Sequence, residues 1–247
     1  MSMHHCMPIA IWYHSRRIPD FSMNSISDSD FVAQSEAYMP TPTIVEQIID
    51  QRIVAIVRLE RYDRAVEVAR ALADGGITAI EFTLTGEGAN EAIAACRAAL
   101  DDVLVGVGTV LDELAASAAI NAGAQFVVTP ALRPKVILSC KAYGVPILCG
   151  ALTPTEALTA HELGADMIKI FPARAFGPAY IKDLLAPLPF LKLVPTGGIG
   201  PENARSYFDA GAAAVGIGGN LVAAKAVAAQ DWAAITTVAR SCVAAVR

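Results

Sequence analysis

Lys169 is the residue whose surroundings point most directly to chemistry. It lies within Met167-Ile168-Lys169-Ile170-Phe171-Pro172, an apolar run with the composition of a buried strand. Alternation along a strand would put Met167, Lys169 and Phe171 on one side and the two isoleucines on the other. Removal from water favours a neutral amine over an ammonium ion, and a neutral amine can attack a ketone. The same pattern also fits a lysine that extends from a strand end into solvent.

Glu81 is a second charged residue inside an apolar run, after Ile80 and before Phe82. Alternation puts Glu81 on the same side of its strand as Thr83. A Schiff-base aldolase needs an acid beside its amine, because a proton must be moved at the substrate hydroxyl and later at the pyruvate methyl carbon. An internal ion pair between Glu81 and Lys169, without any chemistry, would produce the same pattern.

Arg58 follows the apolar run Val54-Ala55-Ile56-Val57 and is a candidate for holding a substrate carboxylate. A guanidinium can bind a carboxylate through two parallel hydrogen bonds, which would also direct the neighbouring ketone toward an amine. The alternative is an exposed arginine that pairs with Glu60 or Glu87.

Two glycine-rich segments could bind an anion. They are Pro195-Thr196-Gly197-Gly198-Ile199-Gly200-Pro201 and Gly216-Ile217-Gly218-Gly219-Asn220, and each follows or ends an apolar run. Glycine exposes backbone amides, and barrel enzymes frequently bind phosphate at the turns after the last two strands. Gly108-Thr109 and Thr129-Pro130 are weaker signals, because small residues after a strand often serve only the turn.

These residues need a scaffold that gathers strand ends from the whole chain. Apolar runs alternate with helical segments eight times, at a spacing of about twenty to twenty-five residues. We therefore predict an α/β fold of the (β/α)8 TIM-barrel class, which a chain of 247 residues suits as one domain. The predicted strands are residues 53–57, 79–83, 103–107, 125–128, 146–149, 167–171, 192–194 and 214–217.

The helical segments carry their own start and stop signals. Thr43-Ile44-Val45-Glu46 and Thr153-Pro154-Thr155-Glu156 have the residues of a capping box, which predicts a helix start at each place. Gly75-Gly76, Gly123 and Gly164 fall where helices should end before the next strand. We assign all of these to architecture rather than to a site.

Residues 1–38 differ from the rest, because they are rich in serine and have no helical or strand period. They include a short apolar run, but Arg16 and Arg17 follow it rather than precede it, unlike in a secretory signal. We predict an N-terminal extension over 1–38 that is disordered or not native, and the barrel over 39–247.

Composition excludes several classes of function. The 19 basic and 24 acidic residues give a net charge of -5, and the basic residues are scattered, so nucleic acid is not an expected partner. Charges interrupt every long apolar stretch, and no membrane span is expected. The five cysteines form no CxxC pair, which suits a reduced, cytoplasmic protein. Three of the four histidines precede residue 39, so no metal site and no cofactor are expected.

Taken together, the motifs resemble the 2-keto-3-deoxy-6-phosphogluconate / 4-hydroxy-2-oxoglutarate aldolase family over roughly residues 44–222. The motifs that carry this resemblance are Glu81-Phe82-Thr83, Gly106-Val107-Gly108-Thr109-Val110, Thr129-Pro130, Lys169-Ile170-Phe171-Pro172, Pro195-Thr196-Gly197-Gly198 and Gly218-Gly219.

The resemblance implies a class I aldolase that cleaves a keto-deoxy acid to pyruvate and an aldehyde, and a homotrimer. Lys169 would form the Schiff base, Glu81 would be the general acid and base, and Thr109 and Pro130 would line the pyruvyl pocket. Phe171, on the same side of its strand as Lys169, is a further expected substrate contact. The residues implied to hold a distal phosphate are Thr196, Gly197, Gly198, Gly219 and Asn220.

The chain departs from the family pattern at two positions. Thr85 stands where some members have an arginine for the substrate carboxylate, and members with threonine there often keep an arginine at the position of Arg58. Asn220 stands where many members have serine. The segment 175–182 resembles the branch that acts on the galactonate epimer, so the epimer at C4 stays open. Two rival hypotheses are another phosphate-binding barrel, such as an isomerase or a thiamin-phosphate synthase-like enzyme, and a barrel that binds a sugar phosphate without catalysis.

Overall fold

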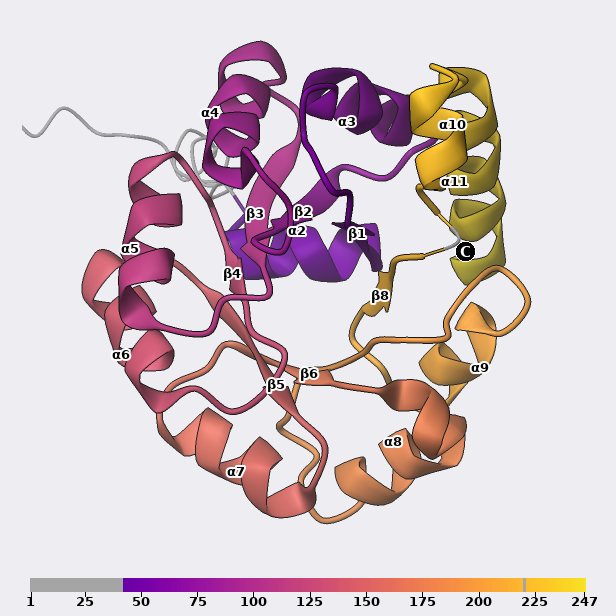
Figure 1. Ribbon diagram of the computed structural model, residues 1–247. Coiled ribbons are helices and arrows are strands. Elements are labelled where there is room, and N and C mark those ends of the chain that lie inside the picture. The colour runs from indigo at the N-terminus through magenta and orange to yellow at the C-terminus, as the bar shows by residue number, and fades with distance from the viewer. Residues whose placement is uncertain (1–41, 220) are drawn as a thin grey trace, which may run out of the picture. The chain divides into compact units, whose positions relative to one another are not determined.

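The computed structural model describes residues 42–219 and 221–247, which form a barrel of alternating strands and helices (Figure 1). The predicted extension over 1–38 lies outside the described residues, and so does Asn220. The strands are β1 (Ile53–Val57), β2 (Ala79–Thr83), β3 (Leu104–Gly108), β4 (Val127–Val128), β5 (Ile147–Ala151), β6 (Met167–Ile170), β7 (Leu193–Pro195) and β8 (Val215–Ile217).

The helices lie around the outside of the barrel, except for the one that precedes β1, which lies behind the strands in Figure 1. They are α2 (Ile44–Gln51), α3 (Ala65–Asp74), α4 (Ala89–Ala99), α5 (Glu113–Asn121), α6 (Pro134–Tyr143), α7 (Pro154–Glu162), the short 3-10 helix η1 (Ala173–Ala175), α8 (Gly177–Leu185), α9 (Ala204–Asp209), α10 (Ala224–Ala228) and α11 (Trp232–Val246). The last of these packs against α3 and α9.

All the strands pair in parallel, in the order β7-β6-β5-β4-β3-β2-β1-β8. The seam between β7 and β8 is held more sparsely than the other strand pairs. It has one isolated bridge, between Thr196 and Gly216, and a hydrogen bond of 2.9 Å from the Ala213 amide to the Leu193 carbonyl. The predicted (β/α)8 fold is confirmed.

Strands β1 and β2 have their predicted bounds, and the other strands differ from prediction by one or two residues at their ends. Two of these differences have identifiable reasons. The prediction began β4 at Gln125, but this residue uses its side-chain oxygen as well as its backbone to bind Val105. The prediction ended β6 at Phe171, whereas the strand ends at Ile170. Pro172 has no amide to continue a strand ladder.

The helix signals lie where the sequence predicts them. Thr43 and Thr153 cap α2 and α7, and each forms the full capping box with the glutamate three residues later. Gly123 and Gly164 follow α5 and α7 with φ of 106° and 95°, a left-handed conformation that glycine adopts without strain.

The strands separate two apolar layers. Side chains such as Ile53, Ala55 and Ile168 face the helices and belong to the larger, outer core. Others, including Phe126 and Met167, fill the barrel interior, where they pack with Ile48 of α2. Helix α2 therefore covers the amino-terminal end of the barrel, and the strand-to-helix turns surround the opposite, carboxyl end.

Candidate active site

Strands β2 and β6 bring Glu81 and Lys169 together inside the barrel. The distance from the Lys169 Nζ to the Glu81 Oε1 is 3.7 Å, and their side chains are only 7% and 1% exposed. Ile168 and Ile170, which flank the lysine, belong to the outer core. Both residues line a small space inside the barrel, together with apolar interior side chains and with Thr196 and Gly216.

A glycine on the neighbouring strand β3 makes room for the Glu81 side chain. The register partners of the two charged residues are also glycines, but a Cβ at Gly106 would meet the Phe126 ring and one at Gly150 would meet the backbone of Pro130. A Cβ at Gly108, the last residue of β3, would lie 2.5 Å from the Glu81 Oε1. Any larger residue at 108 would therefore displace the carboxylate.

Burial dominates the electrostatics of Glu81. It raises the pKa of the carboxyl above its ordinary value, although the positive charges of Lys169 and Arg58 act to lower it. The separation of 3.7 Å from Lys169 is too long for a hydrogen bond, and the Glu81 Oε1 has no hydrogen-bond partner among the described residues. A carboxyl in these surroundings can give and take a proton nearer to neutral pH than an exposed glutamate can.

Arg58 follows β1 and is exposed at the same end of the barrel. Its charge acts on Glu81, and in the described part of the chain it forms no ion pair. Glu87, which the sequence offered as an alternative partner, pairs with Arg61 instead, at 2.7 Å. Arg58 can therefore hold an external carboxylate.

Tyr62 joins the carboxyl ends of β1 and β2, a contact that no sequence pattern predicted. Its hydroxyl lies 3.0 Å from the Val57 carbonyl oxygen, 2.8 Å from that of Thr83 and 3.1 Å from the Thr83 Oγ1. Thr83 also lies 2.8 Å from the Thr85 hydroxyl. The Thr83 side chain, expected on the same side as Glu81, is thus buried in this hydrogen-bonded group.

Thr109, Pro130 and Phe171 follow β3, β4 and β6 at the carboxyl end. Thr109 has φ of 59°, a conformation that is strained for a β-branched residue and is found most often at functional sites. Pro130 is half-buried against the backbone of Gly150. The centre of the Phe171 ring lies 5.6 Å from the Lys169 Nζ.

The two glycine turns lie after β7 and β8. Gly197 and Gly198 have φ of 96° and 79°, and Thr196, just before them, is buried. Within the described residues, the amides of Gly197, Gly198 and Gly219 donate no hydrogen bond. These amides are available to an anion.

Asn203 shapes the first of these turns, and the sequence pattern did not single it out. Its side chain donates to the Gly198 carbonyl at 2.9 Å and accepts from the Gly200 amide at 3.0 Å. Asparagine after a glycine-rich turn is a common closing residue, and this was the available signal.

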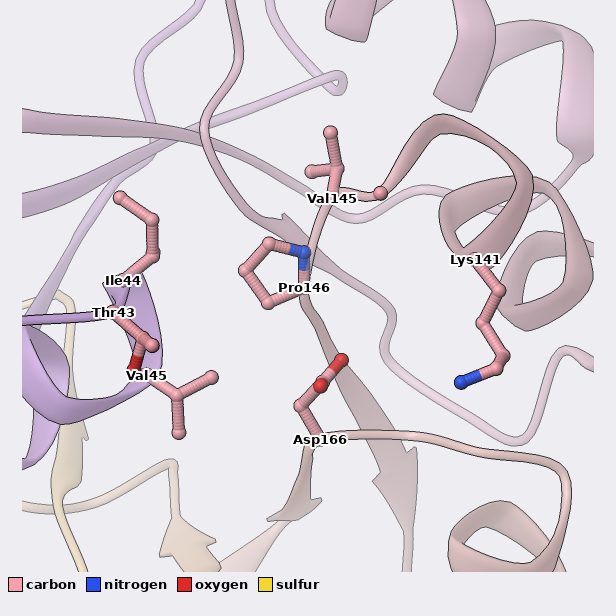
Figure 2. Close-up of a pocket in the computed structure, with 8 residues that line it drawn as sticks. Thr43, Ile44, Val45, Lys141, Val145, Pro146 and Asp166 are labelled. Atoms are coloured by element: carbon pink, nitrogen blue, oxygen red, sulfur yellow. The ribbon is translucent and has the colours of Figure 1, made fainter. Parts of the chain in front are cut away.

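A surface hollow of about 340 Å³ lies elsewhere (Figure 2). It is lined by the start of α2 and by Lys141, Pro146 and Asp166, near the amino-terminal ends of β5 and β6. The Asp166 carboxylate accepts a hydrogen bond of 2.9 Å from the Ile147 amide. Because barrel enzymes carry their sites at the opposite end, we assign this hollow no part in the chemistry.

In residues 42–219 and 221–247, no three His, Cys, Asp or Glu side chains are grouped as metal ligands. No helix in the same part of the chain combines the length and apolar character needed to cross a bilayer.

A lysine and a carboxylate buried together at the carboxyl end of a (β/α)8 barrel are what a barrel aldolase, a carbon–carbon lyase, requires. The chain belongs to the family of KDPG and KHG aldolases, whose family model matches residues 44–238. The predicted family is therefore confirmed, and the alternative of a different phosphate-binding barrel family is wrong.

Individual relatives agree with this assignment. A 2-dehydro-3-deoxy-phosphogluconate aldolase of Treponema pallidum is 41% identical over 200 residues, which cover 80% of this chain and 95% of the relative. A 2-dehydro-3-deoxy-6-phosphogalactonate aldolase of Escherichia coli is 40% identical over 171 residues, 68% of this chain and 83% of the relative.

One solved structure has a title that describes a covalent intermediate. It is a KDPG aldolase from Legionella pneumophila with pyruvate captured at low pH as a carbinolamine. It matches this chain with a TM-score of 0.75 and 26% identity, and the match covers 80% of this chain and 97% of that one.

Proposed function

We propose that this aldolase cleaves a 2-keto-3-deoxy-6-phospho sugar acid, the gluconate or its galactonate epimer, to pyruvate and glyceraldehyde 3-phosphate. 4-Hydroxy-2-oxoglutarate is a further candidate substrate of the same chemistry. The observation that carries the proposal is the buried Lys169 with its Nζ 3.7 Å from the Glu81 carboxylate. The names of the relatives support this substrate class.

In the first half of the reaction, the Lys169 amine adds to the C2 ketone, and the carbinolamine loses water to form an iminium ion. Glu81 then takes the proton of the C4 hydroxyl as the C3–C4 bond breaks. The electron pair of that bond moves into the iminium and gives an enamine, and the aldehyde leaves. Glu81 is the buried carboxyl within reach of this step.

In the second half, Glu81 returns the proton to C3, which becomes the methyl carbon of pyruvate, and water releases pyruvate from Lys169. Its raised pKa suits Glu81 to both directions of transfer. No metal and no cofactor enter these steps, because the iminium ion itself draws the electron pair.

Binding residues surround the two reacting groups. Arg58 holds the C1 carboxylate by charge, and Thr109, Pro130 and Phe171 enclose the pyruvyl end. The distal phosphate is held by the backbone amides of the two glycine turns and by Thr196, which precedes the first of them. The residues assigned to this end are Thr196, Gly197, Gly198, Gly219 and Asn220.

Trapping with borohydride tests the mechanism. Incubation with pyruvate and borohydride should add one reduced pyruvyl adduct per chain, and peptide mapping should place it on Lys169. The variant Lys169→Met should take up none, while Lys182→Met, which removes an exposed lysine of α8, should behave as wild type. An adduct on another lysine, or no adduct on the wild-type protein, would refute the Schiff base at Lys169.

Turnover separates an enzyme from a barrel that only binds sugar phosphates. Each epimer, and 4-hydroxy-2-oxoglutarate, is supplied in turn, and pyruvate release is measured with and without a chelator. We expect turnover of at least one of the phosphorylated epimers, undiminished by the chelator. Binding without turnover, or loss of activity that added zinc restores, would contradict the proposal.

We also propose that the protein works as a cytoplasmic homotrimer. One solved structure that matches 78% of this chain at 37% identity is a cage built by fusing symmetric oligomeric domains, which supports self-association in the family. Sedimentation at equilibrium should give three times the chain mass, and a monomeric mass would contradict the trimer.

A further inference from the structure

Arg174 lies against the glycine turn that follows β7. It belongs to η1, and its backbone amide donates a hydrogen bond of 3.1 Å to the Gly197 carbonyl. A Cβ at Gly198 would lie 2.8 Å from the Arg174 Cβ and 3.4 Å from its Nε. The side chain of Arg174 therefore lies across Gly198, which places the Nε of its guanidinium beside the turn.

The charge of Arg174 is not used within the described part of the chain. Arg61, Arg64 and Arg205 each form an ion pair, whereas Arg174 is exposed and forms none there. A guanidinium without a carboxylate partner is available to an anion from solution.

The turn itself offers the second half of an anion site. The amides of Gly197 and Gly198 donate no hydrogen bond within the described residues, and the Asn203 side chain holds the turn through bonds to the Gly198 carbonyl and the Gly200 amide. Backbone amides supply only partial charges, so a full positive charge at the same place adds considerably to the attraction for a dianion.

We propose that Arg174 binds the distal phosphate of the substrate and sets the preference of the enzyme for phosphorylated aldehydes over unphosphorylated ones. The inference rests on the proposed function and adds to it a specificity-determining side chain. Arg174 acts on the end of the substrate away from Lys169, so it governs affinity for the aldehyde rather than formation of the Schiff base.

The test compares two aldehydes in the condensation with pyruvate: a three-carbon aldehyde with a phosphate and the same aldehyde without it. In Arg174→Ala, the KM for the phosphorylated aldehyde should rise on the order of tenfold, while kcat stays within about twofold. The unphosphorylated aldehyde should react as in wild type. Arg174→Lys should keep part of the preference, because it keeps the charge but loses the paired donors.

Lys182→Ala is the matched control, because it removes one exposed positive charge from α8. It should leave the preference at the wild-type value. Inorganic phosphate, used as a competitive inhibitor, should inhibit Arg174→Ala more weakly than the wild-type protein or the Lys182 variant.

Two results would overturn the inference. One is an unchanged KM for the phosphorylated aldehyde in Arg174→Ala, and the other is an equal loss with both aldehydes, which would show a structural role. Pyruvate and borohydride separate this failure from failure of the proposed function. Adduct formation at Lys169 with an unchanged aldehyde ratio refutes only the role of Arg174, whereas absence of the adduct from the wild-type protein refutes the Schiff-base mechanism on which it rests.

Discussion

Glu81 shows at the scale of a single residue how burial can outweigh charge. Two cations act on this carboxyl, yet its pKa lies above the ordinary value, because its removal from water is the largest effect. A carboxyl with a raised pKa becomes protonated at a higher pH as the solution is acidified. The step that needs the carboxylate is therefore lost on the acid side, at a pH above the ordinary glutamate pKa of 4.5.

Replacement of Arg58 should shift the pH at which kcat falls on the acid side, the acid limb of the pH profile. The Arg58 charge lowers the Glu81 pKa, so Arg58→Ala should raise it and shift the limb of the kcat profile to higher pH. The measurement is kcat at saturating substrate across the acid and neutral range. Glu81→Gln should have no such limb in its residual activity. A limb that stays in place in Arg58→Ala would show that Arg58 and Glu81 are not coupled.

The orientation of a single residue was predictable where the alternation of apolar and polar residues along one strand determined it. Lys169 and Glu81 break apolar runs, and alternation alone orients them. Tyr62 lies in a loop and Arg174 in the short helix η1, and they contact partners more than twenty residues away in sequence, Thr83 and Gly197. No local pattern encodes which strand end a turn residue contacts, and so these two were missed.

Tyr62 also has a consequence at the scale of elements, because it ties β1 to β2. Tyr62→Phe should lower the free energy of unfolding by about 1–2 kcal/mol, since buried oxygens of Val57 and Thr83 lose a hydrogen-bond partner. Urea denaturation measures this change. The control is Tyr143→Phe, an exposed tyrosine of α6, which should change stability by less than about 0.5 kcal/mol. Equal changes in the free energy of unfolding in the two variants would show that the Tyr62 hydroxyl does not stabilise the contact between β1 and β2.

Strand β3 offers a second prediction at this scale, because its two glycines face different neighbours. Gly108→Ala puts a Cβ 2.5 Å from the Glu81 Oε1 and should lower kcat on the order of a hundredfold by displacing the carboxylate. Gly106→Ala meets the Phe126 ring at 2.4 Å instead. It should cost about 1–3 kcal/mol of stability while kcat stays close to wild type.

The readouts are the melting temperature and kcat of both variants. Near-normal turnover by Gly108→Ala would show that the carboxylate can relocate without loss.

The elements themselves were predictable to within a residue or two at most ends. Strands buried on both faces give continuous apolar runs, and capping boxes fix the starts of α2 and α7. The shorter β4 was not predictable, because whether Gln125 bonds through its backbone or its side chain depends on the neighbouring strand.

For the whole molecule, the barrel should not need residues 1–38. The capping box of α2 is complete within Thr43 and Glu46, and the family match begins at residue 44. Deletion of residues 1–38 should leave the melting temperature and kcat near wild type. A Thr43→Ala variant in the shortened chain should lose about 1 kcal/mol of stability, which checks that the assay detects damage at this end. A large fall in melting temperature on deletion alone would contradict the prediction.

The eightfold alternation of runs and helices made the closed architecture predictable, because parallel strands with intervening helices form few arrangements. This alternation does not predict how many hydrogen bonds join each pair of neighbouring strands. That depends on the lengths of β7 and β8, which end early at their glycine turns.

The sparse seam between β7 and β8 gives the barrel a place to open. Amide hydrogens there, such as that of Ala213, should exchange with solvent deuterium faster than those between β1 and β2, because fewer bonds must break for local opening. The two glycine turns flank this seam, so an anion bound to both would clamp it shut. Inorganic phosphate should then slow hydrogen exchange at the seam alone. Local opening of the seam in the free barrel would then be one step of product release.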